Sequence, residues 1–251
     1  MRIEVAGLPV EVICRYHENE LFFKKDYITD KPPVLTIAPT DADIHNMQAI
    51  LDDMAGRNNE PLVQYSETKL EMNAIYNALC AAMIDRDVLP MHGSALCMDG
   101  AAYVFTAKSG TGKSTHSRFW REVYGDRVWM INDDKPMLKI TDGGVMVCGS
   151  PWNGKHRLGR NACAPLKAIV QLSRDDENHI EPLSEADAFQ MLLTRSYPLP
   201  GSYLYPDAVR KAHIVALAKR VVRIAEFYSL GCNMSPEAAV VAHDGMNTGK
   251  I

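Results

Sequence analysis

The chain has 251 residues, of which 47% are hydrophobic and 23% charged, and its formal net charge is -4. These values are typical of a globular protein that is large enough to bury a substantial core. Lysines and arginines are scattered along the chain, so no basic patch predicts a nucleic acid partner.

The amino terminus and the cysteines indicate the compartment. The stretch MRIEVAGLPV has no basic region followed by a long apolar core, and no stretch is long enough to cross a bilayer. We therefore expect a cytoplasmic protein without a membrane partner. The six cysteines are Cys14, Cys80, Cys97, Cys148, Cys163 and Cys232. They form no close pair and mostly have apolar neighbours, which predicts buried reduced thiols rather than a zinc site or a disulfide framework.

Short apolar runs separated by turn residues occupy positions 2–40, at 3–5, 10–14, 21–23 and 34–37, and predict a small β-rich region. Thr40 with Asp43 predicts a capped helix that ends at Gly56, and a second helix is predicted over 67–85. We expect residues 1–65 to form a small α+β region and residues 66–251 to form the main domain.

The middle of the chain alternates strands and helices. Strands are predicted over 94–98 and 101–106, followed by a glycine-rich loop, a helix over 113–124 and a strand over 128–131. This order builds an α/β nucleotide site. Further strands are predicted over 137–140, 145–148 and 167–172. Three helices are predicted in the carboxyl third: one that begins at Ser184, one over 206–227 and one that begins near Ser235. This part of the chain is therefore expected to be mostly helical.

The glycine-rich loop, AKSGTGKS at 107–114, matches the phosphate-loop pattern at seven of eight positions. The exception is Ala107, which replaces a glycine and is tolerated where φ is negative. Gly110 and Gly112 let backbone N–H groups point at a phosphate, while Lys113 binds the outer phosphates. The residues expected to bind ATP are Ala107, Lys108, Ser109, Gly110, Thr111, Gly112, Lys113, Ser114 and Thr115.

Two adjacent aspartates, Asp133 and Asp134, follow the predicted strand at 128–131. Acids at the carboxyl end of a strand beside a phosphate loop are suited to holding Mg²⁺ and accepting a proton. Adjacent carboxylates on an exposed loop also occur merely for solubility. With the hydroxyl of Ser114, Asp133 is the expected metal ligand.

The segment 91–134, MHGSALCMDGAAYVFTAKSGTGKSTHSRFWREVYGDRVWMINDD, resembles the catalytic core of the HPr kinase/phosphorylase family. The shared features are Met-His-Gly before the first strand, His92 placed 15 residues ahead of Ala107, the loop, and the paired aspartates. The resemblance implies ATP-dependent and Mg²⁺-dependent transfer of a phosphoryl group to a serine hydroxyl. It also implies an α/β fold, a P-loop mixed-sheet kinase core related to phosphoenolpyruvate carboxykinase.

The same resemblance assigns roles to individual residues. Asp134 matches the general base of the family and Asp133 its neighbour. His92 and Lys113 match an active-site histidine and lysine, and Ser114 matches a metal ligand.

The chain departs from the family after Asp134, because no glutamate lies between that residue and Glu177 to match the downstream signature. In its place stands GSPWNGKHRLGR at 149–160. We expect the segment carrying Lys155, His156, Arg157 and Arg160 to be a mobile flap that closes over the phosphates or an acidic acceptor. The alternative is a solvated hairpin tip.

Three functions stay open on the sequence. The first is a serine kinase acting on a peptide or protein, and the second is a kinase for a small molecule such as free serine. The third is a non-enzymatic module that binds ATP and reports it to a partner, although a retained base weighs against it. Association with further copies of the chain also stays open.

Overall fold

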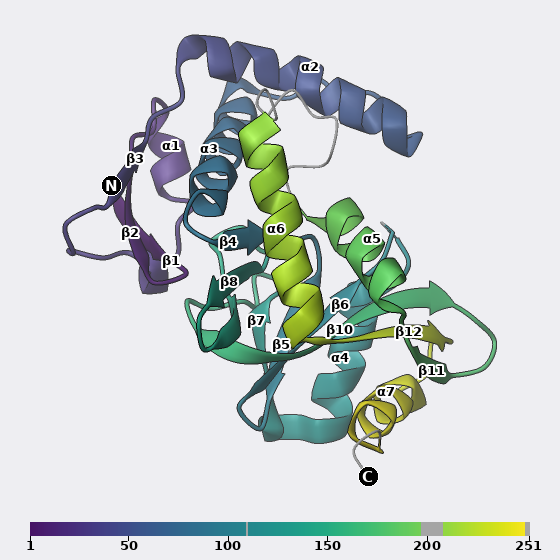
Figure 1. Ribbon diagram of the computed structural model, residues 1–251. Coiled ribbons are helices and arrows are strands. Elements are labelled where there is room, and N and C mark those ends of the chain that lie inside the picture. Colours follow the sequence, from purple (N-terminus) through teal and green to yellow (C-terminus); the bar gives the residue numbers. More distant parts are fainter. Residues whose placement is uncertain (109, 197–207, 249–251) are drawn as a thin grey trace.

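The computed structural model describes residues 1–108, 110–196 and 208–248 and has a mixed α/β architecture (Figure 1). Its first part holds a three-stranded sheet of order β1-β2-β3 together with helices. These elements are β1 (Arg2–Val5), β2 (Leu8–Val12), α1 (His17–Glu20), the 3-10 helix η1 (Lys25–Tyr27), β3 (Leu35–Ile37), α2 (Asp41–Asn58) and α3 (Glu67–Ile84).

The larger second part is a nine-stranded mixed sheet with helices on both faces. Its elements are β4 (Val88–Pro90), β5 (Ser94–Met98), β6 (Ala101–Thr106), α4 (Lys113–Tyr124), η2 (Gly125–Arg127), β7 (Val128–Asn132), β8 (Met137–Thr141), β9 (Gly144–Cys148), β10 (Cys163–Arg174), β11 (His179–Pro182), α5 (Glu185–Arg195), α6 (Ala208–Ile224), β12 (Glu226–Cys232) and α7 (Glu237–Thr248).

The long strand β10 makes the sheet curl. Its first residues pair with β9 in antiparallel fashion, whereas its later residues lie parallel to β6 on one side and to β12 on the other. The strand order is β4-β8-β9-β10-β6-β5-β7, and β12 and β11 extend from β10. The curled mixed sheet therefore joins an antiparallel half to a half with parallel strands.

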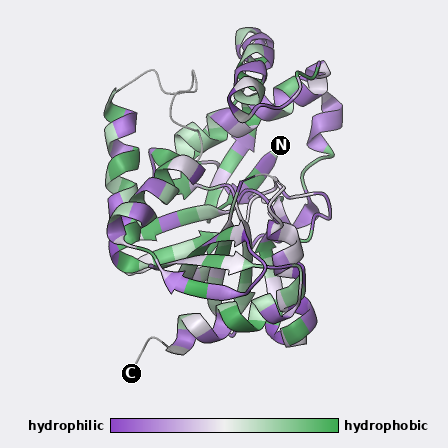
Figure 2. Cartoon of the chain, turned by 90° about the vertical axis from the view of Figure 1, so that its right-hand side faces the viewer, coloured by the Kyte–Doolittle hydropathy of each residue, from purple (hydrophilic) through white to green (hydrophobic). Residues whose placement is uncertain are grey.

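Each face of the sheet buries its own apolar cluster. Helices α5 and α6 cover one face with Met191, Leu217 and Val221, whereas α4 and α7 cover the other with Trp120 and Met246. Figure 2 shows hydrophobic residues on both the strands and the helices. In the part of the chain that the structure describes, no helix combines the length and apolarity that spanning a bilayer requires.

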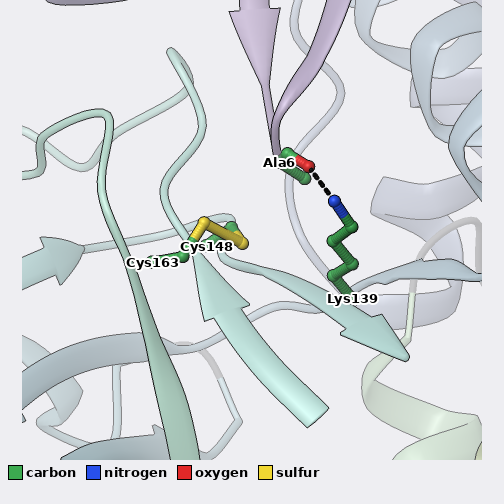
Figure 3. The surroundings of a disulfide bond; sticks show 4 residues. All are labelled: Ala6, Lys139, Cys148 and Cys163. Atoms are coloured by element: carbon green, nitrogen blue, oxygen red, sulfur yellow. Dashed lines mark hydrogen bonds between the residues drawn. A yellow bond between two sulfur atoms is a disulfide. The ribbon is translucent and has the colours of Figure 1, made fainter. Parts of the chain in front are cut away.

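The amino-terminal sheet shares a core with the rest of the chain. Ile3 and Val10 from β1 and β2 join Leu79 of α3, Met137 of β8 and Trp152 in one buried cluster. Lys139 of β8 adds a polar contact, because its Nζ donates to the carbonyl of Ala6 at 2.9 Å (Figure 3). The division at residue 65 stays a prediction.

Several predicted boundaries are confirmed and others are wrong. Thr40 caps α2 in a reciprocal capping box with Asp43, as expected. The helix continues past Gly56 and ends at Asn58, and the next residue, Asn59, caps it with a left-handed φ of 57°. The run 21–23 forms no strand. The predicted helix over 206–227 begins outside the described residues, and α6 ends at Ile224 because the next residues pair with β10 as β12.

The prediction of six reduced thiols is wrong for two of them. Cys148 of β9 and Cys163 of β10 form a disulfide across directly opposed positions of an antiparallel pair, with Cα atoms 4.1 Å apart (Figure 3). Strand register sets this pairing, and a separation of 15 residues gives no sign of it. The other four cysteines are free thiols, as predicted; Cys80 and Cys97 are also buried as predicted, whereas Cys14 and Cys232 are only partly buried.

Candidate active site

The loop between β6 and α4 has the strand, loop and helix order that the sequence predicts. Gly110 and Gly112 have φ values of 74° and 118°, in the left-handed region that favours glycine. Ala107 is 1% exposed and lies outside that region, which explains why a methyl group is tolerated there. Lys108 is exposed, and Ser109 lies outside the described residues.

Lys113, the first residue of α4, lies back across this loop. Its Nζ donates to the carbonyl of Ala107 at 3.3 Å. Burial lowers the pKa of Lys113, and the negative charges of Asp134 and Asp133 act against that decrease. The lysine therefore stands in the electrostatic field of both aspartates.

Sheet topology brings the predicted site residues to one edge. Strand β5 is antiparallel to both β6 and β7, so the start of β5 meets the ends of the other two. The edge therefore receives His92 from before β5, the glycine-rich loop from after β6, and Asp133 and Asp134 from after β7. Gly93 is required here, because a Cβ would lie 2.9 Å from the carbonyl oxygen of Phe105.

His92 and Asp134 form a close pair at this edge. His92 Nε2 lies 3.4 Å from Asp134 Oδ1, and the N–H of Gly93 donates to the Asp134 carbonyl at 3.0 Å. Burial and the charge of Lys113 lower the pKa of His92 to about 4, with Asp134 opposing them. The imidazole is therefore neutral at pH 7 and can orient the carboxylate without neutralising it.

Asp133 is oriented by two hydroxyl groups that the sequence did not single out. Ser94 Oγ donates to Asp133 Oδ1 at 2.9 Å and lies 2.7 Å from Ser117 Oγ on α4. Both serines are fully buried, and Asp133 is 8% exposed. The chain of hydrogen bonds points the carboxylate of Asp133 toward α4. A signal was present, since Ser117 lies three residues after Ser114 on the same helix.

Asn132, the last residue of β7, shapes the turn that carries the aspartates. Its Oδ1 accepts from the N–H groups of Asp134 at 2.8 Å and Lys135 at 2.6 Å. Its amide donates to the carbonyls of Ser150 at 3.0 Å and Trp152 at 3.2 Å. One fully buried side chain thus connects the aspartate turn to the segment after β9.

Arg195, the last residue of α5, is a site residue that sequence analysis missed. Its carbonyl accepts from the N–H of His92 at 2.8 Å, and its charge helps lower the pKa values of both His92 and Lys113. Arg195 Nε is buried without a hydrogen-bond partner among the described residues. No local pattern marks this arginine, because tertiary packing alone brings α5 to the site.

The segment 155–160 differs from the expected unanchored flap. Lys24 Nζ donates to the Gly159 carbonyl at 2.7 Å. The guanidinium of Arg157 lies over the ring of Phe22, to whose carbonyl it donates, and that of Arg160 lies over the ring of Trp129. The apolar run 21–23 thus contacts the segment 155–160. Sequence analysis did not predict this contact, because the two segments lie far apart in the chain. Lys155 and His156 are exposed.

A cavity of about 500 Å³ opens beside the first turns of α4. It is lined by Ser114, Thr115, Ser117, Arg118, Arg121, Met130, Asp133, His156 and Leu158. Magnesium takes one or two protein oxygens and completes its shell with water and phosphate. Ser114 and Asp133 offer oxygen donors of that kind in one cavity, so these residues fit the ion.

Comparisons with known proteins found little. No protein-family model matches the chain, and no curated protein matches it. Among solved structures, the HPr(Ser) kinase/phosphatase from Coxiella burnetii overlaps 63% of this chain and 97% of its own, with a TM-score of 0.34 and 12% sequence identity. A likeness of this degree carries no argument about function, so the function rests on the site itself.

Proposed function

We propose that the protein is an ATP-dependent kinase that transfers the γ-phosphoryl group to a serine hydroxyl of a peptide or protein. The observation that carries the proposal is the convergence of Lys113, Asp133 and Asp134 at one edge of the sheet, beside a glycine-rich turn into a helix. The choice of serine as the acceptor comes from the sequence resemblance described above.

In this proposal Asp134 accepts the proton of the acceptor hydroxyl. A serine hydroxyl is a weak nucleophile, so a carboxylate must take its proton as the new P–O bond forms and the bond to the leaving ADP breaks. The neutral imidazole of His92 at 3.4 Å orients that carboxylate. Because His92 carries no charge at pH 7, it forms no ion pair with the carboxylate.

Positive charge for the phosphates comes from two different elements. Lys113 begins α4, and Arg195 ends α5. Burial lowers the pKa of Lys113, and the charge of Arg195 adds to that decrease. Two neighbouring cations are stabilised by a bound polyanion, which is what a triphosphate supplies. Mg²⁺ held by Ser114 and Asp133 would neutralise further charge on the outer phosphates.

The test is ATP turnover with serine-containing peptides and with free serine, using mass spectrometry to locate the phosphate. Asp134→Asn should lower turnover by roughly 10² to 10⁴ while ATP affinity stays within about threefold. Lys113→Ala should weaken ATP binding as well. Asp142→Asn, on the exposed turn between β8 and β9, makes the same chemical change away from the site and should leave turnover unaltered.

Each other outcome has a definite meaning. Phosphorylation of free serine alone would reassign the acceptor to a small molecule. ATP binding without transfer to any hydroxyl would favour the sensor module. Equal losses of binding and turnover in Asp134→Asn would make that residue a metal ligand instead of a base.

A further inference from the structure

A second cavity, of about 530 Å³, lies beside the first turns of α4. It is lined by Thr111, Gly112, Thr115, His116, Phe119, Leu172, Arg174, Asp175, Asp176, Cys232, Asn233 and Met234. Thr115 lines this cavity and also the one that contains Asp133. The two cavities therefore share a lining residue on the first turn of α4, and only the cavity lined by Asp133 holds a carboxylate of the aspartate turn.

His116 gives this cavity an unused hydrogen-bond donor. The residue is 3% exposed, and its Nε2 accepts from the indole N–H of Trp120 at 3.0 Å. Because Nε2 accepts a hydrogen bond, it carries no proton, and the single ring proton resides on Nδ1. Nδ1 has no hydrogen-bond partner among the residues that the structure describes.

A buried donor without a partner is unfavourable by about 1 to 3 kcal/mol. Proteins retain such groups mainly where a ligand or an ordered water completes them. His116 is one of the residues that line the cavity, so we look to an occupant of the cavity for the missing acceptor.

The rest of the lining indicates what the occupant is. Phe119 and Leu172 are buried apolar side chains, and Met234 is 71% exposed beside Gly112. Asp175 and Asp176 place two negative charges in the wall, and Arg174, whose guanidinium donates to the Gly110 carbonyl at 2.6 Å, places one positive charge there, so the wall keeps a net negative charge. Carboxylates disfavour a phosphate or an acidic peptide but accept hydrogen bonds from hydroxyl and amino groups. A flat, uncharged group with polar edges fits this surface.

We propose that this cavity binds the nucleoside half of the nucleoside triphosphate, with His116 Nδ1–H donating to an acceptor atom of the base or ribose. The inference rests on the proposed function, because that function places the transferring phosphate next to Asp133 and Asp134. The triphosphate then runs across the start of α4, and the part that does not react enters the second cavity.

The experiment compares two Mg²⁺ complexes as ligands, ATP and inorganic tripolyphosphate, which lacks the nucleoside. His116→Phe should weaken ATP binding about five- to tenfold, the share of one hydrogen bond, and leave tripolyphosphate binding within about twofold. Tyr124→Phe is the control on the same helix, since it removes only the hydroxyl that contacts the Ala239 carbonyl and leaves the cavity lining and the Trp120 to His116 bond intact. It should alter neither affinity more than about twofold.

Because His116 is buried, His116→Phe could impair folding, so a second variant changes an exposed residue of the cavity lining. Met234→Ala changes an exposed residue and should also weaken ATP selectively. Equal losses for ATP and tripolyphosphate in both cavity variants, or no loss for either ligand, would overturn the inference. If the wild-type protein binds neither ligand, the proposed function itself fails. If the wild-type protein binds both ligands and Lys113→Ala loses both, the phosphate site is present, and an unchanged ATP affinity in His116→Phe then overturns only the placement of the nucleoside.

A native cysteine provides a readout that needs no substitution. Cys232 lines the cavity and is partly buried, while Cys14 is a partly buried thiol in the amino-terminal part. ATP should slow alkylation of Cys232 and leave Cys14 unchanged, whereas tripolyphosphate should protect neither. Protection of Cys232 by tripolyphosphate as strong as that by ATP would contradict the placement of the nucleoside.

Discussion

Replacing Asn132 tests whether one buried amide shapes the aspartate turn. Asn132→Ala removes the acceptor for the N–H groups of Asp134 and Lys135 and the donor to the Ser150 and Trp152 carbonyls. The Ser150 carbonyl keeps a donor, the side-chain amide of Asn153 at 3.0 Å, whereas the nearest other donor to the Trp152 carbonyl, the Ser150 hydroxyl at 3.3 Å, lies closer to the Lys135 carbonyl, at 2.7 Å. The main loss therefore falls on two backbone N–H groups.

The magnitude follows from those two groups. Each N–H that loses its acceptor in a partly buried turn raises the free energy of the folded state by about 1 to 3 kcal/mol. Partial access to water reduces this value, because Asp134 and Lys135 are only partly buried. We expect Asn132→Ala to lower the free energy of unfolding by about 2 to 4 kcal/mol.

Urea denaturation followed by circular dichroism measures the change. Asn73→Ala is the control, because within the described residues that side chain bonds only to the Lys69 carbonyl of its own helix. Its effect should stay within about 0.5 kcal/mol. A loss below about 1 kcal/mol for Asn132→Ala would refute the reasoning, since the turn would then be held by other contacts.

Three further predictions concern the disulfide, the aspartate turn and acid stability. Removing the disulfide with Cys148→Ser and Cys163→Ser should lower the free energy of unfolding by about 3 kcal/mol, because the bond restricts the unfolded chain by closing a loop of 15 residues. An unchanged urea midpoint would contradict this. Gly154→Ala places a Cβ 2.8 Å from the Asp133 carbonyl oxygen, so ATP turnover should fall about tenfold. The pKa of His116, about 4, is depressed from 6.5, so the unfolded state binds its proton more readily. Stability should therefore decrease as pH falls from about 6.5 to 4, and less steeply in His116→Phe.

The elements that local sequence determines were predicted well. The strand at 101–106, the glycine loop and the helix at 113–124 match β6, the turn and α4, because glycine conformation and helical periodicity are local properties. The cap at Thr40 was confirmed for the same reason. Such features can be predicted without knowing which residues pack against them.

The features that were missed depend on distant partners. Strand β12 takes its conformation from pairing with β10, so its first two residues were assigned to the preceding helix and the rest of the strand was not predicted. Arg195 reaches the site only through the packing of α5, and Arg157 is anchored by Phe22, more than a hundred residues earlier. Sequence reasoning placed the chemistry near the loop but could not supply the residues that complete and support it.

The shared core of the amino-terminal sheet has a consequence for how the chain unfolds. Ile3 and Val10 are fully buried against α3, β8 and Trp152. A fragment that begins at residue 66 would expose those partner surfaces to water, and Trp152 lies two residues before the glycine that packs on Asp133. Removing the first 65 residues is therefore expected to loosen the aspartate turn itself, so that melting of the small sheet and loss of the site occur in one cooperative step.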